Sequence, residues 1–228
     1  MSSEIKKRIY TGSFLIMIFI LMFLSKIIYL YTIIIVFVLA FIEFANISSR
    51  IFRKKKIYYL FSNIIFLSYL SIVLMITFLG VNGIHFKLVL YVILLTCIAS
   101  DIGGITFGKI FKGPKLTNIS PNKTISGSVG SVLFSFIPLI ILNYFFPENF
   151  LLSKSNIIFC FEITVVCQLG DLLISFFKRK AKVKDTGKIL PGHGGLLDRI
   201  DGIIFALPYA YNNTYGINSY LNISILNF

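Results

Sequence analysis

Residues 170–201 read GDLLISFFKRKAKVKDTGKILPGHGGLLDRID, and they join one apolar run to the next. Four carboxylates and seven cations gather here: Asp171, Asp185, Asp198 and Asp201, with Lys178, Arg179, Lys180, Lys182, Lys184, Lys188 and Arg199. A chain that is 57% hydrophobic does not collect so many charges through composition alone. Carboxylates beside cations suit phosphates held through a divalent metal, because Mg²⁺ binds a few carboxylates and completes its shell with water and phosphate oxygens. This segment is therefore the candidate functional site.

The rest of the chain is lipophilic enough to predict an all-α, polytopic membrane protein. Its mean hydropathy is +0.87, and several apolar runs approach the ~20 residues that a helix needs to cross a bilayer. Helices satisfy their own backbone hydrogen bonds, as a lipid environment requires. A seventh apolar segment can begin at Gly202. Six transmembrane helices are predicted, at residues 10–25, 27–45, 57–80, 86–108, 125–146 and 156–177.

The domain organisation follows from these helices. We expect residues 1–228 to form a single integral-membrane domain. Within it, residues 1–100 would supply N-terminal membrane spans, and residues 101–228 a catalytic membrane region. The loops at 109–124 and 178–200 would lie at the cytoplasmic face.

Basic residues predict the orientation. With a cytoplasmic N-terminus, all but three of the 22 Lys and Arg residues fall on the inner side; the three are Lys26, Lys87 and Lys154. Positive residues stay in the cytoplasm, so the active site is expected to face it, from the inner membrane if the source is bacterial. Topology and anionic headgroups then account for the net charge of +13. Nucleic-acid binding is not expected, because the cations belong to membrane loops and no recognition module is present.

The fourth predicted helix ends in a second polar cluster. The cluster comprises Ser100–Gly104 and, beyond the helix, the Ser-Pro-Asn-Lys-Thr run at 120–124. Gly103 and Gly104 favour close helix packing. Lys123 and neighbouring hydroxyl groups precede a helix N-terminus, and this arrangement predicts an anion-binding site. No P-loop motif is present.

Spacing predicts which charged groups share a face. Asp171, Ser175 and Lys178 stand at i, i+4 and i+7 on the sixth helix. Asp198 and Asp201 stand at i and i+3 where the last helix begins. Two helices would thus present three carboxylates to one point, enough for one or two metal ions. A solvated basic loop with salt bridges is the alternative, but it does not explain Asp171 inside an apolar helix.

Two more acids lie in predicted spans. Glu43 is near the inner end of the second span, where its side chain can snorkel to the interface, and is interpreted as structural. Glu162 lies deeper. It either serves function, as many intramembrane acids do, or accepts a hydrogen bond from a neighbouring helix.

The segment from Ser175 to Asp201 resembles the signature of the phosphatidate cytidylyltransferase family, also called CDP-diacylglycerol synthases. The resemblance extends to Gly170–Leu172, to the 120–124 run and back to Asp101. Two positions depart from it, since family members usually carry an acid where this chain has Ser126 and Ile174. The signature positions that match are Ser175, Lys178, Arg179, Lys184, Asp185, Gly187, Pro191, His193, Gly194, Gly195, Asp198, Arg199 and Asp201.

The resemblance implies a nucleotidyl transfer in phospholipid biosynthesis, in which CTP and phosphatidate give CDP-diacylglycerol and pyrophosphate. It implies Mg²⁺, with room for a second cation, bound by Asp171, Asp198 and Asp201. The catalytic residues that it implies are Asp171, Ser175, Lys184, Asp185, Asp198 and Asp201. The phosphate contacts that it implies are Lys123, Lys178, Arg179, His193 and Arg199.

Two other functions stay open at this point. A CTP-dependent lipid kinase would use the same metal cluster but transfer the γ-phosphate. A transporter or channel would use Glu43, Glu162 and Asp171 as pathway residues, although the charges concentrate at one membrane face. The expected partners are CTP, phosphatidate and the bilayer, and a homodimer is left open.

Overall fold

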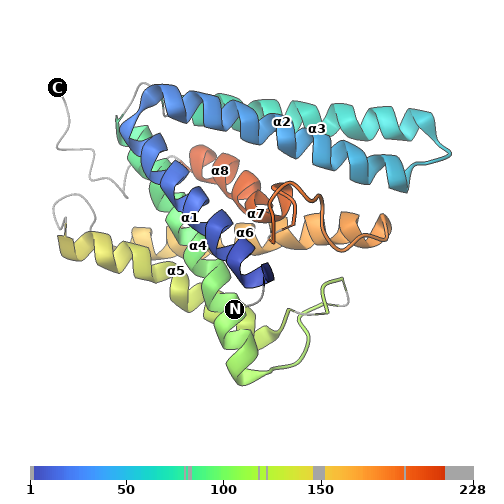
Figure 1. The fold of residues 1–228 in the computed structure, drawn as a ribbon. Coiled ribbons are helices and arrows are strands. Elements are labelled where there is room, and N and C mark those ends of the chain that lie inside the picture. Colours follow the sequence, from blue (N-terminus) through green and yellow to red (C-terminus); the bar gives the residue numbers. More distant parts are fainter. Residues whose placement is uncertain are drawn as a thin grey trace. The chain divides into compact units, whose positions relative to one another are not determined.

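The computed structural model describes residues 3–79, 81, 84–117, 119–121, 123–145, 152–192 and 194–213. These residues form helices joined by short loops, with isolated β-bridges and no longer strand among them (Figure 1). The helices are α1 (Ser3–Leu24), α2 (Lys26–Ile51), α3 (Lys56–Leu79), α4 (Ile84–Phe111), α5 (Ile125–Phe145), α6 (Lys154–Lys180), α7 (Leu197–Ile200) and α8 (Ile203–Asn212).

Six of these helices, α1 to α6, are long and apolar enough to cross a membrane. They confirm the prediction of a polytopic helical membrane protein. Most helix ends lie beyond the predicted ones, whereas α1, α3 and α5 end one residue earlier than predicted. The extensions occur because polar and basic residues continue the helices past their apolar stretches, as α6 does to Lys180. The predicted seventh segment begins as the ten-residue α8. Residues 214–228 lie outside the described residues, so a full seventh span stays a prediction.

The chain divides into two compact units. Unit 1 comprises residues 1–83 and 176–201, and unit 2 comprises residues 84–175 and 202–228. The predicted division into N-terminal spans at residues 1–100 and a catalytic region at residues 101–228 is a division by function, and it stays a prediction. The single integral-membrane domain stays a prediction as well.

In unit 1, α2 and α3 lie side by side (Figure 1). The Phe44 and Phe66 rings stack with centroids 3.8 Å apart. Nearer the other end of the pair, the buried Tyr29 hydroxyl donates a 2.7 Å hydrogen bond to the Thr77 carbonyl. Phe44 also meets the edge of Phe177, with centroids 5.6 Å apart. The Phe44 side chain of α2 therefore packs against α3 and against Phe177, just before the cations at the end of α6.

In unit 2, glycines bring α4 and α5 into backbone contact. A Cβ added at Gly103 would overlap the Gly130 carbonyl oxygen, and one added at Gly104 would lie 2.6 Å from Ser131 Oγ. The packing predicted for Gly103 and Gly104 is confirmed. Close approach of small residues is how helices associate where lipid removes the hydrophobic driving force.

The start of α8 packs on α6 within the same unit. A Cβ at Gly202 would overlap the Cys167 Sγ. At the other end of α8, Asn213 Nδ2 donates to Glu162 Oε2 at 3.0 Å. Glu162 thus accepts a hydrogen bond from a neighbouring segment, one of the two roles that the sequence left open.

Candidate active site

The charged loop of unit 1 closes through a tight turn. Leu190 and Gly194 exchange two backbone hydrogen bonds of 3.0 and 3.1 Å. Gly192 and Gly194 have φ of +77° and +84°, a left-handed conformation that glycine adopts without steric cost. From α1, the Thr11 hydroxyl donates to the Pro191 carbonyl at 2.8 Å. His193 lies outside the described residues.

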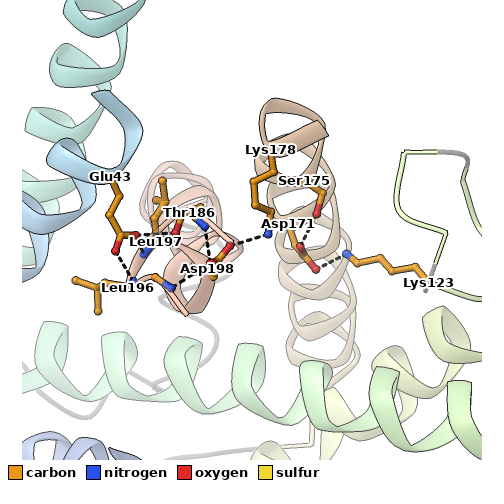
Figure 2. Close-up of polar contacts among 10 residues, drawn as sticks. Glu43, Lys123, Asp171, Ser175, Lys178, Thr186, Leu196, Leu197 and Asp198 are labelled. Atoms are coloured by element: carbon orange, nitrogen blue, oxygen red, sulfur yellow. Dashed lines mark hydrogen bonds and ion pairs between the residues drawn. The ribbon is translucent and has the colours of Figure 1, made fainter. Parts of the chain in front are cut away.

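Asp198 is the residue on which the loop converges (Figure 2). Its Oδ2 accepts hydrogen bonds from the backbone amides of Thr186, at 2.8 Å, and Gly195, at 3.2 Å. Its Oδ1 lies 2.6 Å from the Lys178 ammonium at the end of α6. The Asp198 side chain is only 9% exposed. One carboxylate therefore joins the start of the loop, its end and the helix before it.

A second carboxylate reaches the same loop from α2 (Figure 2). Glu43 is 1% exposed. Its Oε2 accepts from the Thr186 hydroxyl at 2.7 Å and from Leu197 N at 2.8 Å, and its Oε1 accepts from Leu196 N at 2.9 Å. The expectation that Glu43 snorkels to the interface was wrong, because three buried donors hold its carboxylate inside the protein.

The other charged residues of unit 1 surround this anchored core. A Cβ at Gly194 would lie 3.4 Å from both Asp185 Cγ and Asp198 Oδ2. Two acidic side chains therefore lie next to the turn. Asp201 is 7% exposed. The exposed candidates in this unit are Arg179, Lys184, Asp185 and Arg199.

In unit 2, two side chains surround the Asp171 carboxylate (Figure 2). It forms an ion pair with Lys123, and its Oδ1 accepts from the Ser175 hydroxyl at 3.3 Å. The Asp171 and Lys123 side chains are 28% and 26% exposed. The Asp171–Ser175 pair confirms that these residues share a face of α6.

A small hairpin positions Lys123. Leu116 N donates to the Lys123 carbonyl at 2.8 Å, and Lys123 N donates to the Ser120 carbonyl at 3.0 Å. The Thr124 hydroxyl then accepts from Gly127 N at 3.1 Å, where α5 begins. Lys123 therefore projects from a fixed backbone.

The two departures from the family pattern have simple local explanations. Ser126 Oγ accepts a 3.1 Å hydrogen bond from Gly113 N and so closes the hairpin. Ile174 is fully buried. A hydroxyl and an alkyl group thus stand where the resemblance expects acids, and both serve packing within unit 2.

The structure therefore gathers the predicted residues into two clusters. Unit 1 holds Asp198, Lys178 and Asp185, and unit 2 holds Asp171, Ser175 and Lys123. Within the described part of either unit, no three acidic, histidine or cysteine side chains gather closely enough to bind a metal. A cluster of Asp171, Asp198 and Asp201 stays a prediction from the sequence.

Sequence reasoning missed Thr186 and the role of Glu43. Thr186 stands between Asp185 and Gly187 and is 6% exposed. Its position directly after a candidate site acid was the available signal. For Glu43, the signal was a carboxylate inside an otherwise apolar helix, which is costly unless hydrogen bonds satisfy it.

Comparisons with known proteins agree on one family. A family model described as "Cytidylyltransferase family" matches residues 51–215. The phosphatidate cytidylyltransferase of Staphylococcus haemolyticus (strain JCSC1435) is 42% identical over 132 residues, which are 56% of this chain and 48% of that protein. The protein of the same name from Rickettsia typhi (strain ATCC VR-144 / Wilmington) is 43% identical over 125 residues, 50% of this chain and 51% of that protein. The chain spans about half the length of the curated relatives it matches.

Proposed function

The chain belongs to the cytidylyltransferase family, and we propose that it acts as a phosphatidate cytidylyltransferase. It would convert CTP and phosphatidate to CDP-diacylglycerol and pyrophosphate. An oxygen of the lipid phosphate would attack the α-phosphorus of CTP, and the bond to the β-phosphate would break with pyrophosphate as the leaving group. The observation that carries the proposal is the Asp198 loop, a fixed carboxylate among cations within the matched region.

The residues of the loop suit this chemistry. Both reactants are anions, so the site must hold phosphates against their mutual repulsion. The exposed Arg179, Lys184 and Arg199 offer cations to phosphate oxygens, and an arginine can bind a phosphate through two parallel hydrogen bonds. Lys178 keeps its ammonium at Asp198, where it can also reach a bound phosphate. His193 would be a further phosphate contact by resemblance.

In unit 2, Lys123 and Asp171 would serve the same reaction. Lys123 would contact substrate phosphate when it exchanges its partner Asp171 for an anionic oxygen. Ser175 would keep the Asp171 carboxylate in place through its hydrogen bond. The partial exposure of this pair supports the proposal, because a substrate must be able to reach it.

The donor chemistry fits magnesium. The candidate ligands are carboxylate oxygens, which Mg²⁺ prefers, and both Asp171 and Asp198 already stabilise a neighbouring ammonium group. We propose that Asp171, Asp198 and Asp201 would hold Mg²⁺, with room for a second cation. When bound, it would neutralise phosphate charge and align the two reactants.

The orientation proposed for the site is cytoplasmic, from the inner membrane of a bacterial cell. The asymmetry of the basic residues supports this orientation. The substrates support it as well, because a nucleotide comes from the cytosol and a lipid headgroup lies at the interface. The kinase and transporter alternatives gain no support from the family match.

Labelled nucleotide tests the reaction. Purified protein with phosphatidate, Mg²⁺ and CTP labelled at the α-phosphate is expected to transfer label into lipid. The control uses CTP labelled at the γ-phosphate, whose label should leave as pyrophosphate. Lipid labelling from the γ-position alone would assign the kinase reaction instead, and no labelling from either position would reject both.

A further inference from the structure

We propose that Glu43 is a positioning residue for the active-site loop and that it fixes Asp198 from the opposite side of the loop. The inference rests on the proposed function for its effect on turnover. The anchoring of the loop can be tested without any assay of activity.

The pocket around Glu43 is built for a carboxylate. Its three hydrogen bonds come from one hydroxyl and two backbone amides, at 2.7 to 2.9 Å. A Cβ at Gly187 or Gly195 would overlap the Glu43 carboxylate or its immediate partners. Two glycines on opposite arms of the loop thus make room for the same side chain. Such burial is costly unless the charged oxygens are hydrogen-bonded, and here both are.

The loop residues that bind Glu43 also bind or adjoin Asp198. Thr186 donates its hydroxyl to Glu43 and its backbone amide to Asp198. Leu197 donates its amide to Glu43 and directly precedes Asp198 in the chain. The backbone amide of Gly195 donates to Asp198 Oδ2. The same glycine lies so close to Glu43 that an added Cβ would be 2.5 Å from Glu43 Oε2. A displacement of Glu43 would therefore move the partners of Asp198 together.

This arrangement gives Glu43 an effect on turnover although no substrate need touch it. A misplacement of about 1 Å far from the reacting atoms can cost about 100-fold in rate. Glu43→Gln keeps the size of the side chain but replaces one acceptor oxygen with an NH₂ group. That group would face an amide or hydroxyl donor, and a buried donor would lose its partner.

The decisive experiment uses the full chain in detergent and compares Glu43→Gln with Thr186→Val and Thr186→Ser. Trypsin is added under native conditions, and cleavage after Lys184 and Lys188 reports how firmly the loop is held. We expect at least about tenfold faster cleavage in Glu43→Gln and Thr186→Val. Thr186→Ser keeps the hydroxyl and should restore wild-type protection. The matched control is Glu162→Gln, the same change at an acid of unit 2 that bonds Asn213, and it should be cleaved like wild type.

Kinetics then separate positioning from general destabilisation. We expect kcat to fall at least about tenfold in Glu43→Gln and Thr186→Val, with a smaller change in KM for CTP, and the double variant to lose less than the product of the two losses. Wild-type cleavage rates in Glu43→Gln and Thr186→Val would overturn the proposal, whatever their turnover. If wild type itself formed no CDP-lipid, the proposed function would fail, while the cleavage pattern would still decide whether Glu43 anchors the loop.

Discussion

Asp198 and Asp171 were expected to do the same work, but their surroundings differ. Asp198 is 9% exposed and is held by two backbone amides and Lys178. Asp171 is 28% exposed and is held by the side chains of Lys123 and Ser175. Backbone donors have little freedom to move, whereas two side chains can change rotamer when a substrate arrives. The comparison indicates a fixed carboxylate in unit 1 and an adjustable one in unit 2.

The largest effect is expected from Asp198→Asn. The amide cannot satisfy two backbone donors and an ammonium at once, so both the charge and the loop geometry are lost. Turnover should fall about 100-fold or more, since disturbing even the outer partners of a metal site costs ~10–100-fold. Tryptic cleavage after Lys188 should also accelerate. Turnover with CTP and phosphatidate, at equal expression and monodispersity, checks this.

Asp171→Asn sharpens the contrast. It should lower turnover ~10–100-fold but leave cleavage after Lys188 at the wild-type rate, because the ion pair and the hydrogen bond that it disturbs are made with Lys123 and Ser175 of unit 2. If both carboxylates act as one functional group, the double variant should lose little more than Asp198→Asn alone. If the loss of turnover in the double variant equalled the product of the two single losses, Asp171 and Asp198 would act independently. That result would contradict the prediction of a shared metal site.

Adjacent cations offer a smaller test. Lys178→Ala leaves the nearly buried Asp198 without its ammonium, whereas Arg179→Ala removes an exposed charge. Removing one partner of a buried pair is the more costly change. We expect kcat to fall clearly in Lys178→Ala and chiefly KM to rise in Arg179→Ala. Unchanged kinetics in both variants would leave these cations as determinants of membrane topology, with no role in substrate use.

The smallest effect on turnover is expected from Gly103→Ala. The added methyl would overlap the Gly130 carbonyl and force α4 and α5 apart, at a cost of about 1–3 kcal/mol for overpacking. The hairpin that carries Lys123 joins these two helices, so the change should disturb Asp171 and spare the Asp198 loop. Thermal unfolding in detergent measures the loss. Gly12→Ala is the control, since a Cβ there meets nothing within 4 Å, and an unchanged melting temperature in Gly103→Ala would contradict the packing.

Local patterns in the sequence predicted much of this architecture. Apolar runs located all six long helices, helical spacing placed Asp171 with Ser175, and glycines marked the α4–α5 contact. Contacts across long separations were not predictable in this way. Thr186 meets Glu43 across 143 residues, and no periodicity in a single sequence connects them. Lys178 was assigned to phosphate, and its pairing with Asp198 depends on how the loop folds back.

Whether the Asp198 loop carries out nucleotidyl transfer is tested most directly by pyrophosphate release. Wild type and Asp198→Asn would be compared side by side, with CTP and Mg²⁺ present and phosphatidate added to start the reaction. Wild type should release one pyrophosphate for each CDP-lipid formed, and none before phosphatidate is added. Asp198→Asn should release it about 100-fold more slowly while still eluting as a folded protein. Pyrophosphate release at the wild-type rate in Asp198→Asn would contradict the account.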